Sequence, residues 1–195
     1  MRQLRLLLCS SAFFALMTLP AFAHTGGVSG GFREGIAHPI FGPDHLIAMV
    51  AVGLWGAFLR SPAIFVLPIV FPLIMAIGGV LGILGLPLPA TEPIIAVSAV
   101  VLGLMVALAA RPPLWLAAVL VGAFAIFHGY AHGKELPASA NALAYSLGFV
   151  VATGLLHLSG IALGLSARWP AGRIGVRGAG AAIACGGLAF LWRLA

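Results

Sequence analysis

Long apolar segments constrain this chain more than any other feature of its sequence. After a short N-terminal stretch, six apolar runs follow one another, separated by proline, glycine or charged residues. A helix needs roughly 20 apolar residues to cross the hydrocarbon core of a bilayer. We therefore predict an all-α integral membrane protein with six transmembrane helices. We place the spans near residues 44–59, 63–84, 94–110, 114–132, 139–165 and 178–194.

Composition agrees with a membrane protein and argues against a soluble one. Of the 195 residues, 62% are hydrophobic and 7% are charged, whereas a soluble domain carries about 25% charged residues. The formal net charge is +6, but the basic residues are scattered singly and form no patch for nucleic acid. The first partner that we expect is therefore the lipid bilayer, and nucleic acid is not a partner.

The first 23 residues are typical of a cleaved signal peptide. A basic start precedes an apolar run over residues 6–19, and Ala21-Phe22-Ala23 fits a small-x-small cleavage site. Cleavage would make His24 the new N-terminus, outside the cytoplasm. Residues 24–195 would then form a single six-helix transmembrane domain. An uncleaved first helix is the alternative.

Charged residues in the connections predict the orientation of the chain. If His24 lies outside, the inner connections carry five basic residues and no acidic one. The outer segments carry three basic and three acidic residues. This asymmetry agrees with the positive-inside rule. We expect a multi-pass protein of a bacterial inner membrane, with both ends of the mature chain in the periplasm. The inner basic residues are Arg60, Arg111, Arg168, Arg173 and Arg177.

The first polar cluster opens the first span. An ionisable side chain in a membrane span is costly and is a functional-site hypothesis by default. The cluster contains His38, Asp44 and His45. Pro39 and Pro43 oppose a continuous helix, so we expect the backbone to bend at the membrane edge and a helix to begin at Pro43. Two imidazoles beside a carboxylate are a ligand set for a divalent cation of intermediate softness.

The second polar cluster ends the fourth span. His128 and His132 are four residues apart, so both imidazoles project from one face of a helix and can chelate one metal ion. Glu135 returns to that face if the helix persists through Gly133. It would then be a further ligand or a partner that orients an imidazole. Both clusters fall at the outer ends of their spans under the predicted orientation.

Three further residues are candidates for an ion path. His157 lies inside the fifth span and is either a second ion site or a structural histidine. Met49 shares a helical face with His45, although a methionine there is more often a packing residue. His24 would offer an amine and an imidazole that chelate together, if cleavage exposes it.

The two clusters together resemble the HupE/UreJ family of nickel and cobalt permeases. The family pattern of histidine, five residues, aspartate, histidine is matched by His38, Asp44 and His45. Its second pattern, FHGxAHGxE, is matched by residues 127–135. The resemblance extends over nearly the whole chain. It implies uptake of nickel, or of cobalt in some members, to supply metalloenzymes such as hydrogenase or urease.

We predict a secondary or facilitated transporter rather than an enzyme. It would take up Ni²⁺ or Co²⁺ from periplasm to cytoplasm as cargo, with no resident cofactor. A histidine and carboxylate set without thiolate argues against copper(I) but does not separate nickel, cobalt and zinc. The sequence has no phosphate-binding GxxxxGK[ST] motif, so direct drive by ATP is not expected from this chain.

The alternative function is a membrane-embedded metalloenzyme, a zinc hydrolase or a di-iron protein, that uses the same histidines. The sequence contains no HExxH motif and no second carboxylate–histidine helix motif to complete a di-iron set. A scaffold protein that binds no metal is a third interpretation, but it leaves the clustered ionisable residues without a purpose.

Overall fold

The computed structural model describes residues 31–136 and 141–195, and the secondary structure within these ranges is helical. This confirms the all-α prediction for the described residues. The predicted signal peptide and His24 lie outside them. The elements are α2 (Phe32–Phe41), α3 (Pro43–Leu59), α4 (Ala63–Ile83), α5 (Thr91–Ala107), α6 (Leu114–Glu135), α7 (Ala142–Leu165), the short 3₁₀ helix η1 (Ser166–Arg168) and α8 (Pro170–Leu194).

Several of these helices are long and apolar enough to cross a bilayer. Four of them, α4, α6, α7 and α8, pass by length and composition, and α2 with α3 would make a fifth span that is bent by 81°. On α4 the large apolar side chains of Phe65, Ile69 and Leu73 point outward, which suits lipid rather than water. The chain is therefore a multi-pass membrane protein. The predicted span near residues 94–110 corresponds to α5, which has 17 residues, and its crossing stays a prediction.

The helix bounds correct the sequence-based spans at two places. Helix α5 begins at Thr91 and not at residue 94, because Pro93 lies in the first helical turn, where a missing N–H is tolerated. Helix α8 begins at Pro170 and not at residue 178. Arg173 and Arg177 therefore lie on α8 and not in a connection. Arg177 Nε donates to the carbonyl of Ala107 at 2.7 Å and so caps the end of α5. Helix α5 also ends three residues before the predicted bound, at Ala107, and every predicted span except that of α8 agrees with its helix to within three residues at each end.

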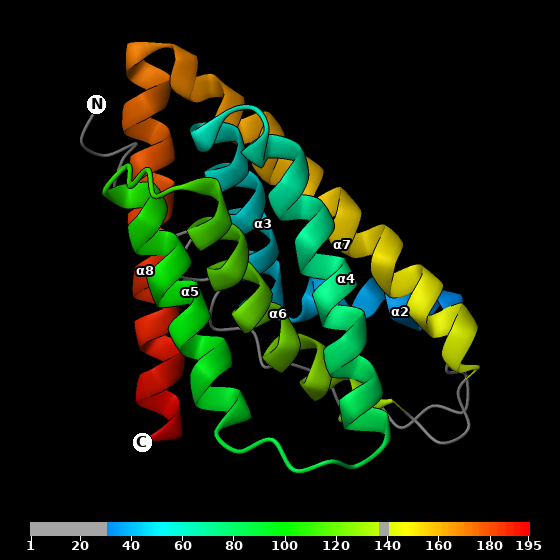
Figure 1. The fold of residues 1–195 in the computed structure, drawn as a ribbon. Coiled ribbons are helices and arrows are strands. Elements are labelled where there is room, and N and C mark those ends of the chain that lie inside the picture. The colour runs from blue at the N-terminus through cyan, green and yellow to red at the C-terminus, as the bar shows by residue number, and fades with distance from the viewer. Residues whose placement is uncertain (1–30, 137–140) are drawn as a thin grey trace, which may run out of the picture.

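Close contacts at glycine residues determine how the helices pack. Helix α4 packs on α6, α5 on α8, and α2 and α3 on α7 (Figure 1). A Cβ on Gly78 of α4 would overlap the Ile126 carbonyl, and one on Gly129 of α6 would overlap the Met75 carbonyl. Without a hydrophobic effect between helices in lipid, such small residues are what allow close packing. We call this close contact between α4 and α6 the glycine seam. It also sets the position of the α6 histidines, because Gly129 lies next to His128.

Helix α3 lies at the centre of the bundle. Twelve of its 17 residues are buried, including Trp55 and Met49, which are fully enclosed. A Cβ on Gly53 would overlap the His157 carbonyl of α7, and one on Gly160 of α7 would overlap the Val50 carbonyl of α3. In the first turn of α3 the His45 side chain is therefore buried, whereas that of Asp44 beside it is 29% exposed.

Candidate metal site

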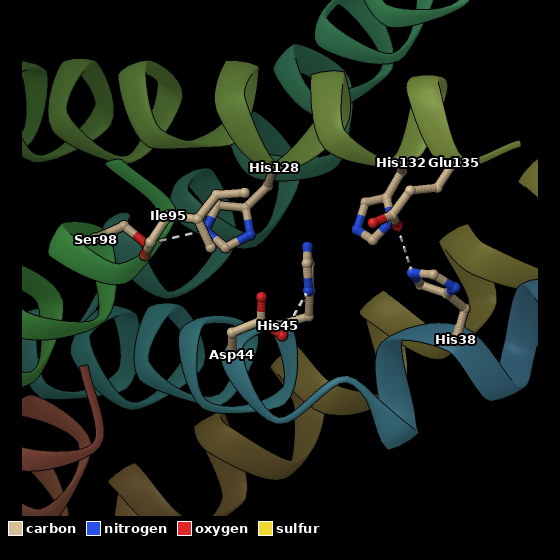
Figure 2. Close-up of polar contacts among 8 residues, drawn as sticks. All are labelled: His38, Asp44, His45, Ile95, Ser98, His128, His132 and Glu135. Carbon is tan, nitrogen blue, oxygen red and sulfur yellow. Dashed lines mark hydrogen bonds and ion pairs between the residues drawn. The ribbon is translucent and has the colours of Figure 1, made fainter. Parts of the chain in front are cut away.

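The two predicted polar clusters come together at one end of the bundle. Figure 2 shows the start of α3 facing the end of α6, with the end of α2 beside them. The side chains from these three helices point toward one another between them. All six residues predicted as metal ligands belong to this group, namely His38, Asp44, His45, His128, His132 and Glu135.

A sharp bend at Gly42 makes this arrangement possible. Helix α2 ends at Phe41 and α3 begins at Pro43, and the two axes differ by 81°. The Gly42 N–H bonds to the His38 carbonyl at 2.9 Å. We expected irregular backbone around Pro39, but Pro39 lies within α2, and the break in the helix falls at Gly42 instead. The predicted helix start at Pro43 is confirmed. The bend turns His38 back over the first turn of α3.

The inner part of the site contains Asp44, His45 and His128. His45 Nδ1 donates to Asp44 Oδ1 at 3.0 Å, which leaves the Nε2 lone pair of a neutral His45 ring free. The His45 and His128 rings are 4.9 Å apart and nearly perpendicular. Both imidazoles are buried. Asp44 stands in the first turn of α3, where the positive end of the helix favours a carboxylate.

The outer part contains His38, His132 and Glu135. One ligand atom from each lies within 4.8 Å of the others. Glu135 Oε2 is 3.2 Å from His38 Nε2 and 4.0 Å from His132 Nδ1. The α6 helix continues through Gly133 to Glu135, as this placement required. The His38 and Glu135 side chains are 24% and 48% exposed, so this part of the site opens toward the surroundings. The rings of His132 and His45, 4.1 Å apart, join it to the inner part.

Unpartnered nitrogen atoms distinguish this cluster from an ordinary polar network. Among the described residues, six buried side-chain nitrogen or oxygen atoms have no hydrogen-bond partner. Four of them are His45 Nε2, His128 Nδ1 and both ring nitrogens of His132. Each such atom costs about 1–3 kcal/mol, and folded proteins rarely tolerate several together. Converging imidazole lone pairs beside carboxylates suit a divalent transition-metal ion.

His157 and Thr153 account for the other two unpartnered atoms. His157 is buried on α7, and its ring bonds to the backbone of Pro68. Pro72 has no N–H to offer the Pro68 carbonyl within α4, so the histidine supplies the missing donor. Its Nε2 stays without a partner. The Phe71 ring lies 5.6 Å from His128 and 5.5 Å from His157, and so contacts both. His157 thus has a structural hydrogen bond and a free lone pair, and its place on an ion path stays a prediction.

Met49 lies fully buried in the apolar core one turn after His45. Its placement fits the packing interpretation, and a role as a ligand stays a prediction. His24 lies outside the described residues.

Two residues of α5 stand near the cluster although sequence reasoning did not assign them to it. Glu92 interacts electrostatically with Asp44 and Glu135. Its sequence signal was an acidic residue at the start of a span, on the side of the membrane where both clusters are predicted to lie. Ser98 Oγ lies 2.9 Å from His128 Nε2. It had no signal, because a serine in an apolar helix commonly bonds to its own backbone.

The fold and this site define a class: a multi-pass helical membrane protein with a candidate transition-metal site buried at one end. Comparison with known proteins gives the family. The family model described as "HupE / UreJ protein" matches residues 12–190. The chain is 45% identical over 179 residues to "Protein HupE" from Rhizobium leguminosarum bv. viciae, which covers 91% of this chain and 94% of that protein. No solved structure matches. The chain belongs to the HupE/UreJ family, which confirms the resemblance given by the two motifs.

Proposed function

We propose that this chain carries a divalent transition-metal ion, Ni²⁺ first and Co²⁺ second, from periplasm to cytoplasm. The observation that supports this most directly is the set of four unpartnered nitrogen atoms on three histidines beside Asp44. The HupE/UreJ family is a nickel and cobalt uptake family, so the ion would be cargo and not a resident cofactor. Zn²⁺ shares these ligands and belongs in any test of selectivity.

Capture would begin at the outer part of the site. Glu135 is the most exposed of the six side chains at 48%, and with His38 and His132 it offers a ligand set that is already gathered within 4.8 Å. These atoms would replace water molecules around the incoming ion. Neutral imidazole binds a metal ion and protonated imidazole does not, so capture depends on pH.

The ion would next move to the inner part of the site. His132 adjoins His45 directly, so one ligand can hold the ion while the next joins. Asp44 fixes the His45 ring through Nδ1, which presents Nε2 to the ion. His128 completes this set. Conduction fails where binding is too tight, so a series of sites with exchangeable ligands suits a transporter.

His157 would be the next station inward. Its Nε2 is buried and unpartnered, one helical turn after the unpartnered hydroxyl of Thr153. The predicted orientation puts the six-residue site at the periplasmic end and His157 nearer the cytoplasm. A cation that moves inward gains roughly 2.3 kcal/mol per charge for each 100 mV of membrane potential, which can drive uptake without ATP.

The metalloenzyme alternative is not favoured. It would use the same histidines, but membership in a transport family points to passage of the ion rather than to chemistry at it.

Uptake of radioactive nickel into proteoliposomes tests the proposal. The purified parent protein would be compared with the double variant His128→Ala/His132→Ala and with Ser159→Ala. Ser159 is an exposed α7 residue whose hydroxyl bonds to its own helix. Size-exclusion profiles and thermal unfolding would show that all three are folded. We expect saturable uptake by the parent and by Ser159→Ala, and none by the double variant. Stoichiometric nickel binding without entry into the lumen would contradict transport and favour the metalloenzyme.

A further inference from the structure

Ser98 is a buried polar residue that the uptake mechanism has not used. It lies in the middle of α5 and is fully buried, as is His128 on the neighbouring helix α6. Its Oγ makes two short contacts. One is 2.6 Å long and reaches the carbonyl of Ile95, one turn earlier on α5. The other is 2.9 Å long and reaches Nε2 of His128 (Figure 2).

Accounting for the protons gives each contact a direction. A serine hydroxyl has one hydrogen, and the Ile95 carbonyl can only accept. The serine proton therefore lies between Oγ and the carbonyl oxygen. Towards His128 the serine oxygen has only lone pairs to offer, so His128 Nε2 must carry the hydrogen and donate it. A neutral imidazole with its proton on Nε2 has its lone pair on Nδ1.

The remaining nitrogen of His128 is the one that faces the site. Nδ1 is buried and has no hydrogen-bond partner. Figure 2 shows Ser98 on one side of the His128 ring and His45 on the other. We propose that Ser98 is a positioning residue, which holds His128 in the Nε2–H tautomer and so presents Nδ1 to a divalent transition-metal ion. The identity of that ion rests on the proposed function, whereas the tautomer does not.

The serine makes His128 a different ligand from His45. Asp44 holds His45 through Nδ1 and adds negative charge, which strengthens the imidazole as a donor to metal. Ser98 holds His128 through Nε2 and adds no charge. The two rings therefore present opposite nitrogens, Nε2 from His45 and Nδ1 from His128, toward one volume. A ligand oriented by a neutral hydroxyl holds the ion less tightly, which suits a site that must also release it.

Nuclear magnetic resonance of ¹⁵N-histidine-labelled protein in lipid nanodiscs tests this assignment. Without metal and at neutral pH, the ring nitrogen shifts distinguish the two neutral tautomers, and His128→Gln identifies the His128 signals. We expect His128 in the parent to be in the Nε2–H form. In Ser98→Ala we expect the Nδ1–H form to appear, and nickel affinity to fall about 10- to 100-fold, as for other residues that orient a metal-binding histidine.

Two comparison variants separate positioning from packing. Ser98→Thr keeps a hydroxyl that can bond back to its own helix, so it should keep the parent tautomer and most of the affinity. Ser159→Ala removes an equivalent hydroxyl, 2.7 Å from the Leu156 carbonyl, at an exposed place on α7 and should change neither. An Nδ1–H form of His128 in the parent would overturn the assignment, even if Ser98→Ala does not fold. An unchanged tautomer and unchanged affinity in a folded Ser98→Ala would overturn it too.

The outcome for transport is separate. A parent that shows the expected tautomer and its change in Ser98→Ala, but moves no nickel, contradicts the proposed function and supports the assignment of Ser98. A parent that moves nickel, with Ser98→Ala equal to it in tautomer and affinity, leaves the transporter intact and overturns the role of Ser98.

Discussion

The glycine seam between α4 and α6 allows a prediction whose size follows from the structure. A Cβ on Gly129 would overlap the Met75 carbonyl oxygen and would lie 2.7 Å from the Met75 carbonyl carbon and 2.9 Å from Gly79 N. Ordinary contact begins at 3.4 Å, so the carbonyl carbon alone requires the two backbones to separate by about 0.7 Å, and the closer carbonyl oxygen requires more. Productive geometry at a binding site tolerates about 0.5 Å. Because His128 adjoins Gly129, the shift would displace the His128 imidazole, which is a ligand in the proposed function.

We therefore expect Gly129→Ala to lose about 1–3 kcal/mol of stability, the usual cost of overpacking, and to bind nickel more weakly. The matched control is Gly122→Ala on the same helix. There the nearest atoms are the Ile74 and Val70 side chains, at 3.6 and 3.7 Å. The extra methyl group fits, and alanine favours the helix by up to about 1 kcal/mol.

The assay is the free energy of unfolding of each purified variant in mixed micelles, measured by titration with a denaturing detergent and followed by tryptophan fluorescence. Nickel affinity is measured on the same samples by calorimetry. The reasoning would be refuted if Gly129→Ala were as stable as Gly122→Ala and bound nickel as the parent does.

Three further predictions concern the path of the ion. Asp44→Asn keeps an acceptor for His45 Nδ1 but removes the charge, so we expect a folded protein with nickel affinity lower by about 10- to 100-fold; calorimetry that finds parent affinity would count against a contribution of the Asp44 carboxylate to metal binding. Uptake should fall as the external pH falls through about 6, because protons compete with metal for imidazole nitrogen; a flat uptake profile from about pH 8 to about pH 5 would argue against an imidazole site. His157→Gln can still donate to the Pro68 carbonyl but loses the imidazole, so nickel should still bind while uptake into vesicles slows; unchanged uptake would remove His157 from the path.

The local features of this site were predictable because they depend on spacing along one helix. His128 and His132 share a face of α6 because they are four residues apart, and Glu135 joins them because α6 continues through Gly133. The start of α3 at Pro43 followed from the fixed backbone angle of proline at a first helical position. The helix around Pro39 was not predicted, since the sequence does not show that α2 can tolerate the loss of one backbone hydrogen bond.

Contacts between helices could not be read from the sequence. Ser98 precedes His128 by 30 residues, and no pattern along either helix pairs them. The early start of α8 could not be predicted either, because arginine residues between apolar runs suggest a connection. In the structure Arg177 lies on the helix and reaches across to the end of α5. Both cases depend on the packing of α5 against its neighbours, which close contacts determine and hydropathy does not reveal.

The partners of the imidazoles change in character with depth, and this gives the proposed path a direction. In the outer part of the site, His38 and His132 lie beside the Glu135 carboxylate. In the inner part, His45 is held by the Asp44 carboxylate. His128 is held by a neutral hydroxyl, and His157 by a backbone carbonyl. A carboxylate partner strengthens the attraction of an imidazole for a cation, and a neutral partner does so less. Capture would therefore be strongest where the ion must leave water. The hold on the ion would weaken where it must be released.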